Sequence, residues 1–179
     1  NPPIKTEYII GEELNTDGLV VEVLYNDDNL REYEINERVV RTKALIINSN
    51  NQILLGYSYK TYQFPGGHQD EGETRDECVV REIKEETGIE NIKVLNENIF
   101  SVEIITVDGH VKRGKYVPSH THLNVVYLLE ADENEVLRMK PDENSDVKWI
   151  NIEDVENAST EKWVVENVYK KINKKLKEM

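Results

Sequence analysis

The sequence has little cysteine, no long apolar run and a shortage of positive charge. Cys78 is the single cysteine among 179 residues, which excludes an intrachain disulfide and a multi-cysteine zinc site and favours a reducing cytoplasm. The longest apolar runs, such as 123–129, are far too short to span a bilayer. Lys and Arg number 22 against 35 Asp and Glu, which disfavours binding to a nucleic-acid polymer or an anionic membrane.

The composition that remains is typical of a soluble globular protein, with 38% hydrophobic and 32% charged residues. Residues 1–37 form a separate N-terminal extension, in which strands over 19–25 and 31–35 and a turn over 26–29 predict a β-hairpin. This extension serves as a partner surface, packs on the rest of the chain or builds a homodimer interface. Residues 38–179 form the main domain.

The main domain alternates strand and helix patterns, which is typical of an α/β fold. A strand, a turn at 48–51 and a second strand predict a hairpin, and Thr160 to Lys177 carries the apolar stripe of an amphipathic terminal helix. The predicted strands are 38–48, 52–59, 92–107, 122–129 and 147–150.

A central helix has clear signals at both ends. Thr74 and Glu77 have the spacing of a capping box, in which each side chain satisfies a free N–H of the first turn. Gly88 is the expected left-handed residue at the C-terminal end. The sequence therefore predicts a helix from about residue 74 to residue 88, directly after the Pro-Gly-Gly break at 65–67.

This helix concentrates negative charge at the edge of its buried face. At about 100° per residue, the apolar stripe of Val79, Val80, Ile83 and Thr87 lies beside an arc that holds three glutamates, Glu82, Glu85 and Glu86. Each like-charge pair costs a few tenths of a kcal/mol, roughly, on an exposed helix, and partial burial raises that cost. The arc is therefore either a solvated acidic face, softened by Lys84 and Arg81, or a site for a divalent cation such as Mg²⁺.

The spacing around these glutamates decides between the two interpretations. Gly67, five residues, Glu73, seven residues, and then the run REIKEETGI at 81–89 match all seven fixed and both aliphatic positions of the Nudix box. The chain therefore resembles a Nudix hydrolase. The resemblance implies an α/β/α sandwich with a mixed β-sheet over about residues 38–155, and it does not cover residues 1–37.

The family hydrolyses a nucleoside diphosphate linked to another group, by attack of water on a P–O–P bridge. The resemblance implies that Glu82, Glu85, Glu86 and the Gly67 carbonyl bind Mg²⁺, with Mn²⁺ as a substitute. It also implies an ion pair between Arg81 and Glu73 that holds the loop against the helix. Arg81 therefore joins the catalytic set through that pair, and Gly88 and Glu73 are structural positions of the box.

The general base is left open by the resemblance, which places it inside the box or on a later loop. Glu82 and Glu85 are the candidates inside the box. Glu143 is the candidate outside it, because it precedes the predicted strand at 147–150, where related enzymes place a catalytic acid. The alternative is that Glu143 is an ordinary loop carboxylate.

Histidine and aromatic residues suggest contacts to a nucleotide-type substrate. His68 follows the glycine loop, and His120 and His122 share one side of a strand, so they either contact phosphates or pack at the strand end. His110 is expected in the turn that Asp108 and Gly109 mark, and it is assigned no role. Tyr62 and Phe64 are candidates for stacking on a base, with packing in the core as the alternative.

The substrate itself is not specified. The stretch 104–107 lacks the proline or tyrosine that marks some subfamilies of the family. A nucleotide sensor that has lost catalysis is the alternative function, but such proteins usually lack box glutamates, and all of them are present here. The sequence therefore favours a Mg²⁺-dependent pyrophosphohydrolase.

Overall fold

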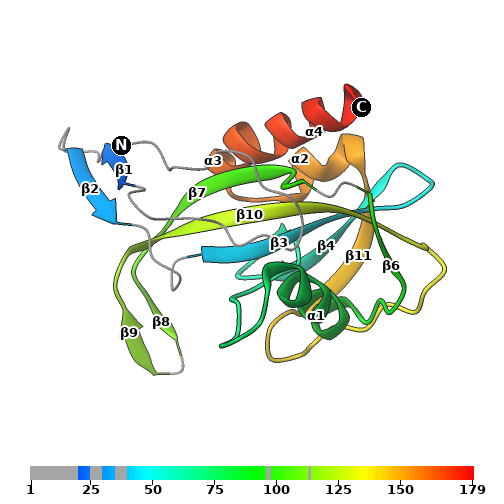
Figure 1. Cartoon of the computed structure of the whole chain (residues 1–179), viewed down its shortest axis with the longest axis horizontal. Helices are drawn as coiled ribbons and strands as arrows, with labels where there is room; N and C mark the ends of the chain where they lie inside the picture. The colour runs from blue at the N-terminus through cyan, green and yellow to red at the C-terminus, as the bar shows by residue number, and fades with distance from the viewer. Residues whose placement is uncertain (1–19, 25–29, 35–39, 96–97, 113) are drawn as a thin grey trace.

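The computed structural model describes residues 20–24, 30–34, 40–95, 98–112 and 114–179 (Figure 1). The strands of its main sheet are β3 (Val40–Ile47), β4 (Gln52–Ser58), β5 (Thr61–Gln63), β6 (Ile92–Val94), β7 (Ser101–Val107), β10 (His120–Ala131) and β11 (Asp146–Asn151). Their order is β11-β4-β3-β10-β6, with β5 paired to β4 and β7 paired to β10. The sheet is mixed, because β3 and β10 run parallel while the other pairs are antiparallel.

Helices cover both faces of this sheet, as Figure 1 shows. Helix α1 (Arg75–Thr87) lies on one face. The other face carries α2 (Val155–Ala158), preceded by the 3₁₀ turn η2 (Ile152–Asp154), and the terminal helix, which runs from α3 (Lys162–Val164) through the π-helical turn η3 (Val165–Tyr169) into α4 (Lys170–Lys177). The predicted α/β/α sandwich is confirmed.

Residues of the central strands alternate between two cores, because successive side chains of a strand point to opposite faces. In β3, Ala44 and Ile46 pack with Ile83 of α1. Leu45, between them, packs with Ile172 of the terminal helix. Strands buried on both sides read as continuous apolar runs, which is why 44–47 and 125–129 contain almost no polar residue.

Both predicted ends of α1 are confirmed. Thr74 is the N-cap, and its backbone N–H donates to the Glu77 carboxylate at 2.9 Å. Gly88 ends the helix with φ of 77°, a left-handed conformation that favours glycine, and its N–H donates to the Lys84 carbonyl oxygen. The amphipathic terminal helix is also confirmed, since Val168, Tyr169 and Ile172 are buried against the sheet.

The prediction of a single strand over 92–107 is wrong. β6 pairs with residues 129–131 of β10 and β7 pairs with residues 120–126, so two short strands lie along different parts of one long strand. Three further short strands were not predicted: β5, and the hairpin of β8 (His110–Lys112) with β9 (Lys115–Val117). His110 therefore begins a strand and is not a turn residue.

In the N-terminal region, β1 (Val20–Leu24) pairs antiparallel with β2 (Leu30–Glu34), as the sequence predicts. The predicted turn over 26–29 lies outside the described residues. The division of the chain at residue 37 and the homodimer interface stay predictions. Along the described part of the chain, no helix is both long enough and apolar enough to cross a bilayer.

The α1 face of the core gives a direct test of this packing. Ile83 is fully buried in that core, so Ile83→Ala removes buried methyl groups and leaves a cavity. We expect its free energy of unfolding in urea to fall by about 2–5 kcal/mol. Lys84→Ala, one position along on the exposed face of α1, is the control and should change stability by less than about 0.5 kcal/mol. Equal losses in the two variants would contradict the packing.

Candidate active site

Strand β3 holds the glycine loop beside α1. The backbone N–H groups of Thr42 and Ala44 donate to the carbonyl oxygens of Gly67 and Pro65, at 3.0 and 2.9 Å. The Lys43 ammonium is buried and donates to the carbonyl oxygens of Phe64, at 2.9 Å, and Gly66, at 3.1 Å. The loop therefore has a fixed position relative to the sheet on which α1 packs.

Arg81 of α1 joins the same loop to the helix. Its guanidinium donates to both carboxylate oxygens of Glu73, at 2.8 and 3.0 Å, so the expected ion pair forms with two-pronged geometry. It also donates to the His68 carbonyl oxygen and to Glu82, each at 3.1 Å. The hydrogen bonds from Arg81 hold the pKa of Glu73 below its usual range.

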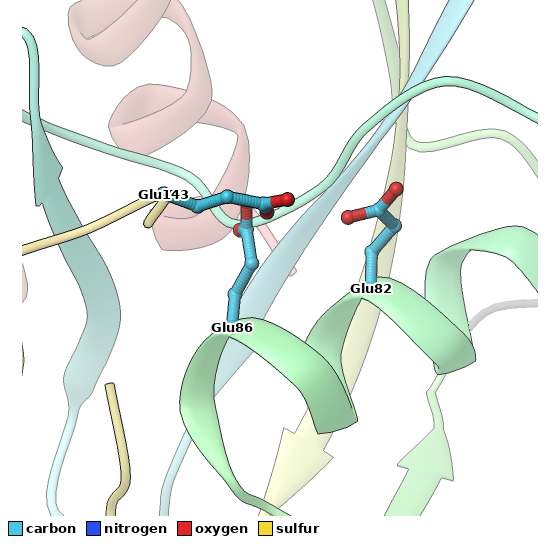
Figure 2. A group of neighbouring side chains, drawn as sticks. All are labelled: Glu82, Glu86 and Glu143. Atoms are coloured by element: carbon cyan, nitrogen blue, oxygen red, sulfur yellow. The ribbon is translucent and has the colours of Figure 1, made fainter. Parts of the chain in front are cut away.

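Three carboxylates meet beside this loop, as Figure 2 shows. Glu82 and Glu86 project from the same side of α1, and Glu143 reaches them from the loop before β11. One oxygen from each lies within 4.8 Å of the others. Among the described acidic, histidine and cysteine side chains, they make the one group of three with this spacing.

The two helix carboxylates are partly removed from water. Burial raises the pKa of Glu82, against the opposing charge of Arg81, and burial likewise raises the pKa of Glu86, against the opposing charge of Lys43. The Glu86 carboxylate accepts a hydrogen bond from the Gly66 N–H at 2.9 Å. Crowded, partly desolvated carboxylate oxygens with this spacing fit a hard divalent cation, which would remove their mutual repulsion.

Glu85, predicted as a ligand, is not part of this group. Its carboxylate lies 2.6 Å from the Lys140 ammonium and 3.6 Å from Arg81, and its side chain is 39% exposed. The hydrogen bond from Lys140 lowers the pKa of Glu85. Lys140 also lies 3.0 Å from Glu143, so this lysine ties the Glu143 loop to α1. The structure thus groups Glu143, rather than Glu85, with Glu82 and Glu86, and the role of Glu85 as a metal ligand stays a prediction.

The carboxylates open into a cleft of about 630 Å³. Cations from three parts of the chain line it together with the acidic groups: Arg41 and Lys43 of β3, Arg81 of α1 and Lys140 of the loop between β10 and β11. Burial, and then the charge of Arg41, lower the pKa of Lys43 to about 7. The sequence analysis did not identify Arg41, Lys43 or Lys140. The sequence signal that could have identified Arg41 and Lys43 was their alternate spacing in an otherwise apolar strand.

The predicted histidines lie close to one another, and His68 lines the cleft. His120 and His122 do share one side of β10, and their Nε2 atoms are 3.0 Å apart. The His68 and His122 rings are 5.5 Å apart. Burial, followed by the charge of Arg41, lowers the pKa of His122 to about 3. The substrate contacts predicted for these histidines stay predictions.

Tyr62 and Phe64, the aromatic residues predicted to stack on a base, both pack against other side chains. Phe64 is buried and its ring meets Tyr169 of the terminal helix at 5.1 Å. Tyr62 is half-buried, donates to Asp146 at 2.5 Å and packs on Tyr57 at 4.8 Å. These contacts explain both aromatic residues as packing groups, and their contact with a base stays a prediction. The aromatic residues that line the cleft are Phe64, Tyr57 and Tyr59, and not Tyr62.

Comparison with known proteins fits this geometry. The family model of the NUDIX domain matches residues 37–172. The chain belongs to the Nudix hydrolase family. It is 26% identical over 142 residues to a Pelagibacter ubique RNA pyrophosphohydrolase, across 75% of this chain and 89% of that protein.

Two solved structures share the fold of this Nudix hydrolase. A Nudix family hydrolase from Clostridium perfringens has a TM-score of 0.56 at 24% identity, covering 80% of this chain and 99% of that chain. The dihydroneopterin triphosphate pyrophosphohydrolase of E. coli has a TM-score of 0.58 at 15% identity, covering 75% and 94%. At these identities the likeness concerns the fold.

Gly67 of this Nudix hydrolase lies against the Glu82 carboxylate. A Cβ atom added at Gly67 would collide with Oε1 of Glu82, so a side chain at this position would displace the Glu82 carboxylate. The Gly67 carbonyl oxygen, predicted as a metal ligand, accepts the hydrogen bond from the Thr42 N–H. Its role as a ligand stays a prediction. The position of the Glu82 carboxylate, by contrast, depends on the absence of a side chain at Gly67.

Gly67→Ala should therefore weaken metal binding. The added methyl group pushes Glu82 out of the carboxylate group, and we expect Mn²⁺ affinity, measured by electron paramagnetic resonance, to fall by at least about tenfold. Gly56→Ala is the matched control, because its Cβ would meet Asn144 at an ordinary 3.7 Å. Native Mn²⁺ affinity in Gly67→Ala would contradict the packing of Glu82 against the loop.

Proposed function

We propose that this Nudix hydrolase is a divalent-metal-dependent pyrophosphohydrolase that cleaves the P–O–P bridge of a nucleotide-type substrate. One observation carries the proposal: three carboxylates, two of them partly desolvated, converge within 4.8 Å in a cleft that also contains cations. A pyrophosphate group is anionic, so an acidic cleft accepts it only when metal ions offset the repulsion. Mg²⁺ is the expected ion and Mn²⁺ its substitute.

Glu82, Glu86 and Glu143 would hold the ion. When bound, a divalent cation supplies charge neutralisation and polarises a phosphoryl oxygen. Arg81 keeps Glu82 in place, since it donates to that carboxylate while it is fixed by Glu73. The Gly66 N–H does the same for Glu86. The two helix carboxylates are thus oriented before substrate arrives, which lowers the reorganisation that catalysis requires.

Glu143 is the group best placed to take the proton of the attacking water. It comes from a loop on the open side of the cleft, and its side chain is 37% exposed, so water reaches it. The Lys140 ammonium lies 3.0 Å from the Glu143 carboxylate. A general base needs hydrogen-bond reach first, and Glu143 brings its carboxylate to the group from a loop separate from α1.

The substrate carries a phosphoanhydride attached to a nucleoside or to an RNA end. The Pelagibacter relative is an RNA pyrophosphohydrolase, and RNA has a phosphoanhydride only at an end that bears two or more phosphates. The net charge of -13 disfavours extended contact with the RNA backbone. The chain therefore recognises the phosphorylated end and adjoining nucleoside rather than a long stretch of polymer. A cytoplasmic location fits such substrates.

Glu86→Gln tests the proposal. The substitution keeps an oxygen that accepts from Gly66 but removes a charged ligand, so the protein should remain folded. We expect the turnover number with Mg²⁺ to fall by at least about a hundredfold. Turnover is measured by phosphate release with coupling enzymes, a pyrophosphatase for nucleoside triphosphates and an alkaline phosphatase for the monoester products of ADP-ribose and nucleotide sugars. Glu90→Gln, an exposed glutamate just beyond α1, is the control. Near-native turnover in Glu86→Gln would contradict the assignment.

A further inference from the structure

The hairpin of β8 and β9 is a locally basic segment of this acidic protein. It projects beyond the ends of β7 and β10, away from the terminal helix (Figure 1). Residues 109–120, which contain the hairpin, include Lys112, Arg113 and Lys115 but no Asp or Glu, although the chain as a whole has a net charge of -13. Such a segment favours contact with an anionic ligand at that position.

The base of the hairpin contacts a residue that lines the cleft. His110 begins β8, and its ring lies 6.5 Å from the ring of Tyr59, which is part of the cleft wall. Nδ1 of His110 lies 2.9 Å from the Asp108 carbonyl oxygen. A carbonyl oxygen only accepts, so Nδ1 carries the proton and the ring has a fixed orientation. The hairpin and the cleft are therefore adjacent.

The face of the hairpin that contains His110 also presents a cation. Val117 pairs with His110 across the hairpin, and Lys115 lies two positions before Val117 in β9. Residues that pair across antiparallel strands share a face, and so do residues two positions apart in one strand. Lys115, which is exposed, therefore lies on the His110 face, about 7 Å farther along it. An ammonium group thus follows the aromatic contact on the side of the hairpin that meets the cleft.

Tyr59 has a constrained backbone and an uncovered ring. Tyr59 and Lys60 form the two-residue turn between β4 and β5, with φ of 51° and 66°, a left-handed conformation that favours Asn and Gly. The Thr160 hydroxyl donates to the Lys60 carbonyl oxygen at 3.2 Å and so holds the turn from outside. Tyr59 is 73% exposed, so burial does not account for an aromatic residue at this strained position. Its ring is open to stacking by a base.

An exposed ring followed by a cation fits a single strand of RNA. Unpaired bases stack on aromatic side chains, and cations attract the phosphates between them. A protein–protein interface, by contrast, is depleted of charged residues at its core, which does not match the composition of residues 109–120. The position beside the cleft is the one that a strand occupies when its phosphorylated end lies at the carboxylates. The chemistry of Tyr59 and Lys115 therefore favours RNA over a protein partner.

We propose that Tyr59 and Lys115 form a track for the first few ribonucleotides that follow the hydrolysed end of an RNA substrate. Tyr59 stacks on a base that leaves the cleft, and Lys115 contacts a phosphate farther along the strand. The contact is limited to a few nucleotides, because the net charge of the chain disfavours a longer one. This track rests on the proposed function, since it makes an RNA end, rather than a free nucleotide, the preferred substrate.

A comparison of substrate length tests the track. The substrates are a nucleoside triphosphate and a short single-stranded oligoribonucleotide with the same first nucleoside and a 5′-triphosphate, each with Mg²⁺. For the native enzyme, we expect KM for the oligoribonucleotide to be at least about tenfold lower than KM for the nucleotide. Tyr59→Ser and Lys115→Gln should each reduce this ratio of KM values by about threefold or more. Lys115→Gln should also weaken the dependence of the oligoribonucleotide KM on salt.

Two control variants remove similar groups elsewhere. Trp163→Ser removes an exposed ring from α3, and Lys174→Gln removes an exposed ammonium group from α4, so both should keep the native ratio of KM values. A native ratio close to one, or equal changes for the two substrates in the track variants, would overturn the track while the proposed hydrolase function stands. Loss of a native dimer in Lys115→Gln, with the ratio unchanged, would overturn it in favour of contact with a second copy of this chain.

A binding measurement makes the two proposals separable. A fluorescent single-stranded oligoribonucleotide with a 5′-hydroxyl end has no phosphoanhydride, so its binding is independent of hydrolysis. Fluorescence anisotropy should give a Kd at least about threefold higher for Tyr59→Ser and for Lys115→Gln than for the native protein. Equal Kd values, or no binding by the native protein, would overturn the track. Weaker binding by both variants, together with no turnover by the native protein, would retain the track and reject the proposed function.

Discussion

The site depends most on the hydrogen bonds that the Arg81 guanidinium donates. It pairs with both oxygens of Glu73, holds the His68 carbonyl and donates to Glu82. One planar group with several donors thus fixes the glycine loop, the helix and a carboxylate relative to one another. Without it, Glu82 would be a buried charge with no cation directly beside it, and burial already raises the pKa of that carboxyl.

The sheet supplies the second half of the arrangement. β3 is apolar on both faces over 44–47. Its earlier residues contact the glycine loop instead, where Thr42 and Lys43 donate hydrogen bonds to backbone carbonyl oxygens. The same strand therefore builds the core at one end and the active-site cleft at the other. Glu143 arrives on the loop before β11, which Lys140 ties to Glu85 of α1.

Local signals predicted the parts of the fold that depend on nearby residues. Thr74, Glu77 and Gly88 define α1 because capping is a matter of a few positions. The split of 92–107 into β6 and β7 was not predictable, since it depends on which part of β10 each segment meets. In the site, box spacing placed Glu82 and Glu86 on one side of α1, but the approach of Glu143 to them was not predictable, because Lys140 of the Glu143 loop lies 55 residues from its partner Glu85 in sequence.

The central claim is that the converging carboxylates form a divalent cation site, and thermal unfolding tests it most directly. A cation that binds only the native state raises the melting temperature. The account predicts that millimolar Mg²⁺ raises the Tm of the native protein and leaves that of the Glu82→Gln, Glu86→Gln double variant unchanged. An unchanged Tm in the native protein, or an equal rise in both proteins, would contradict it.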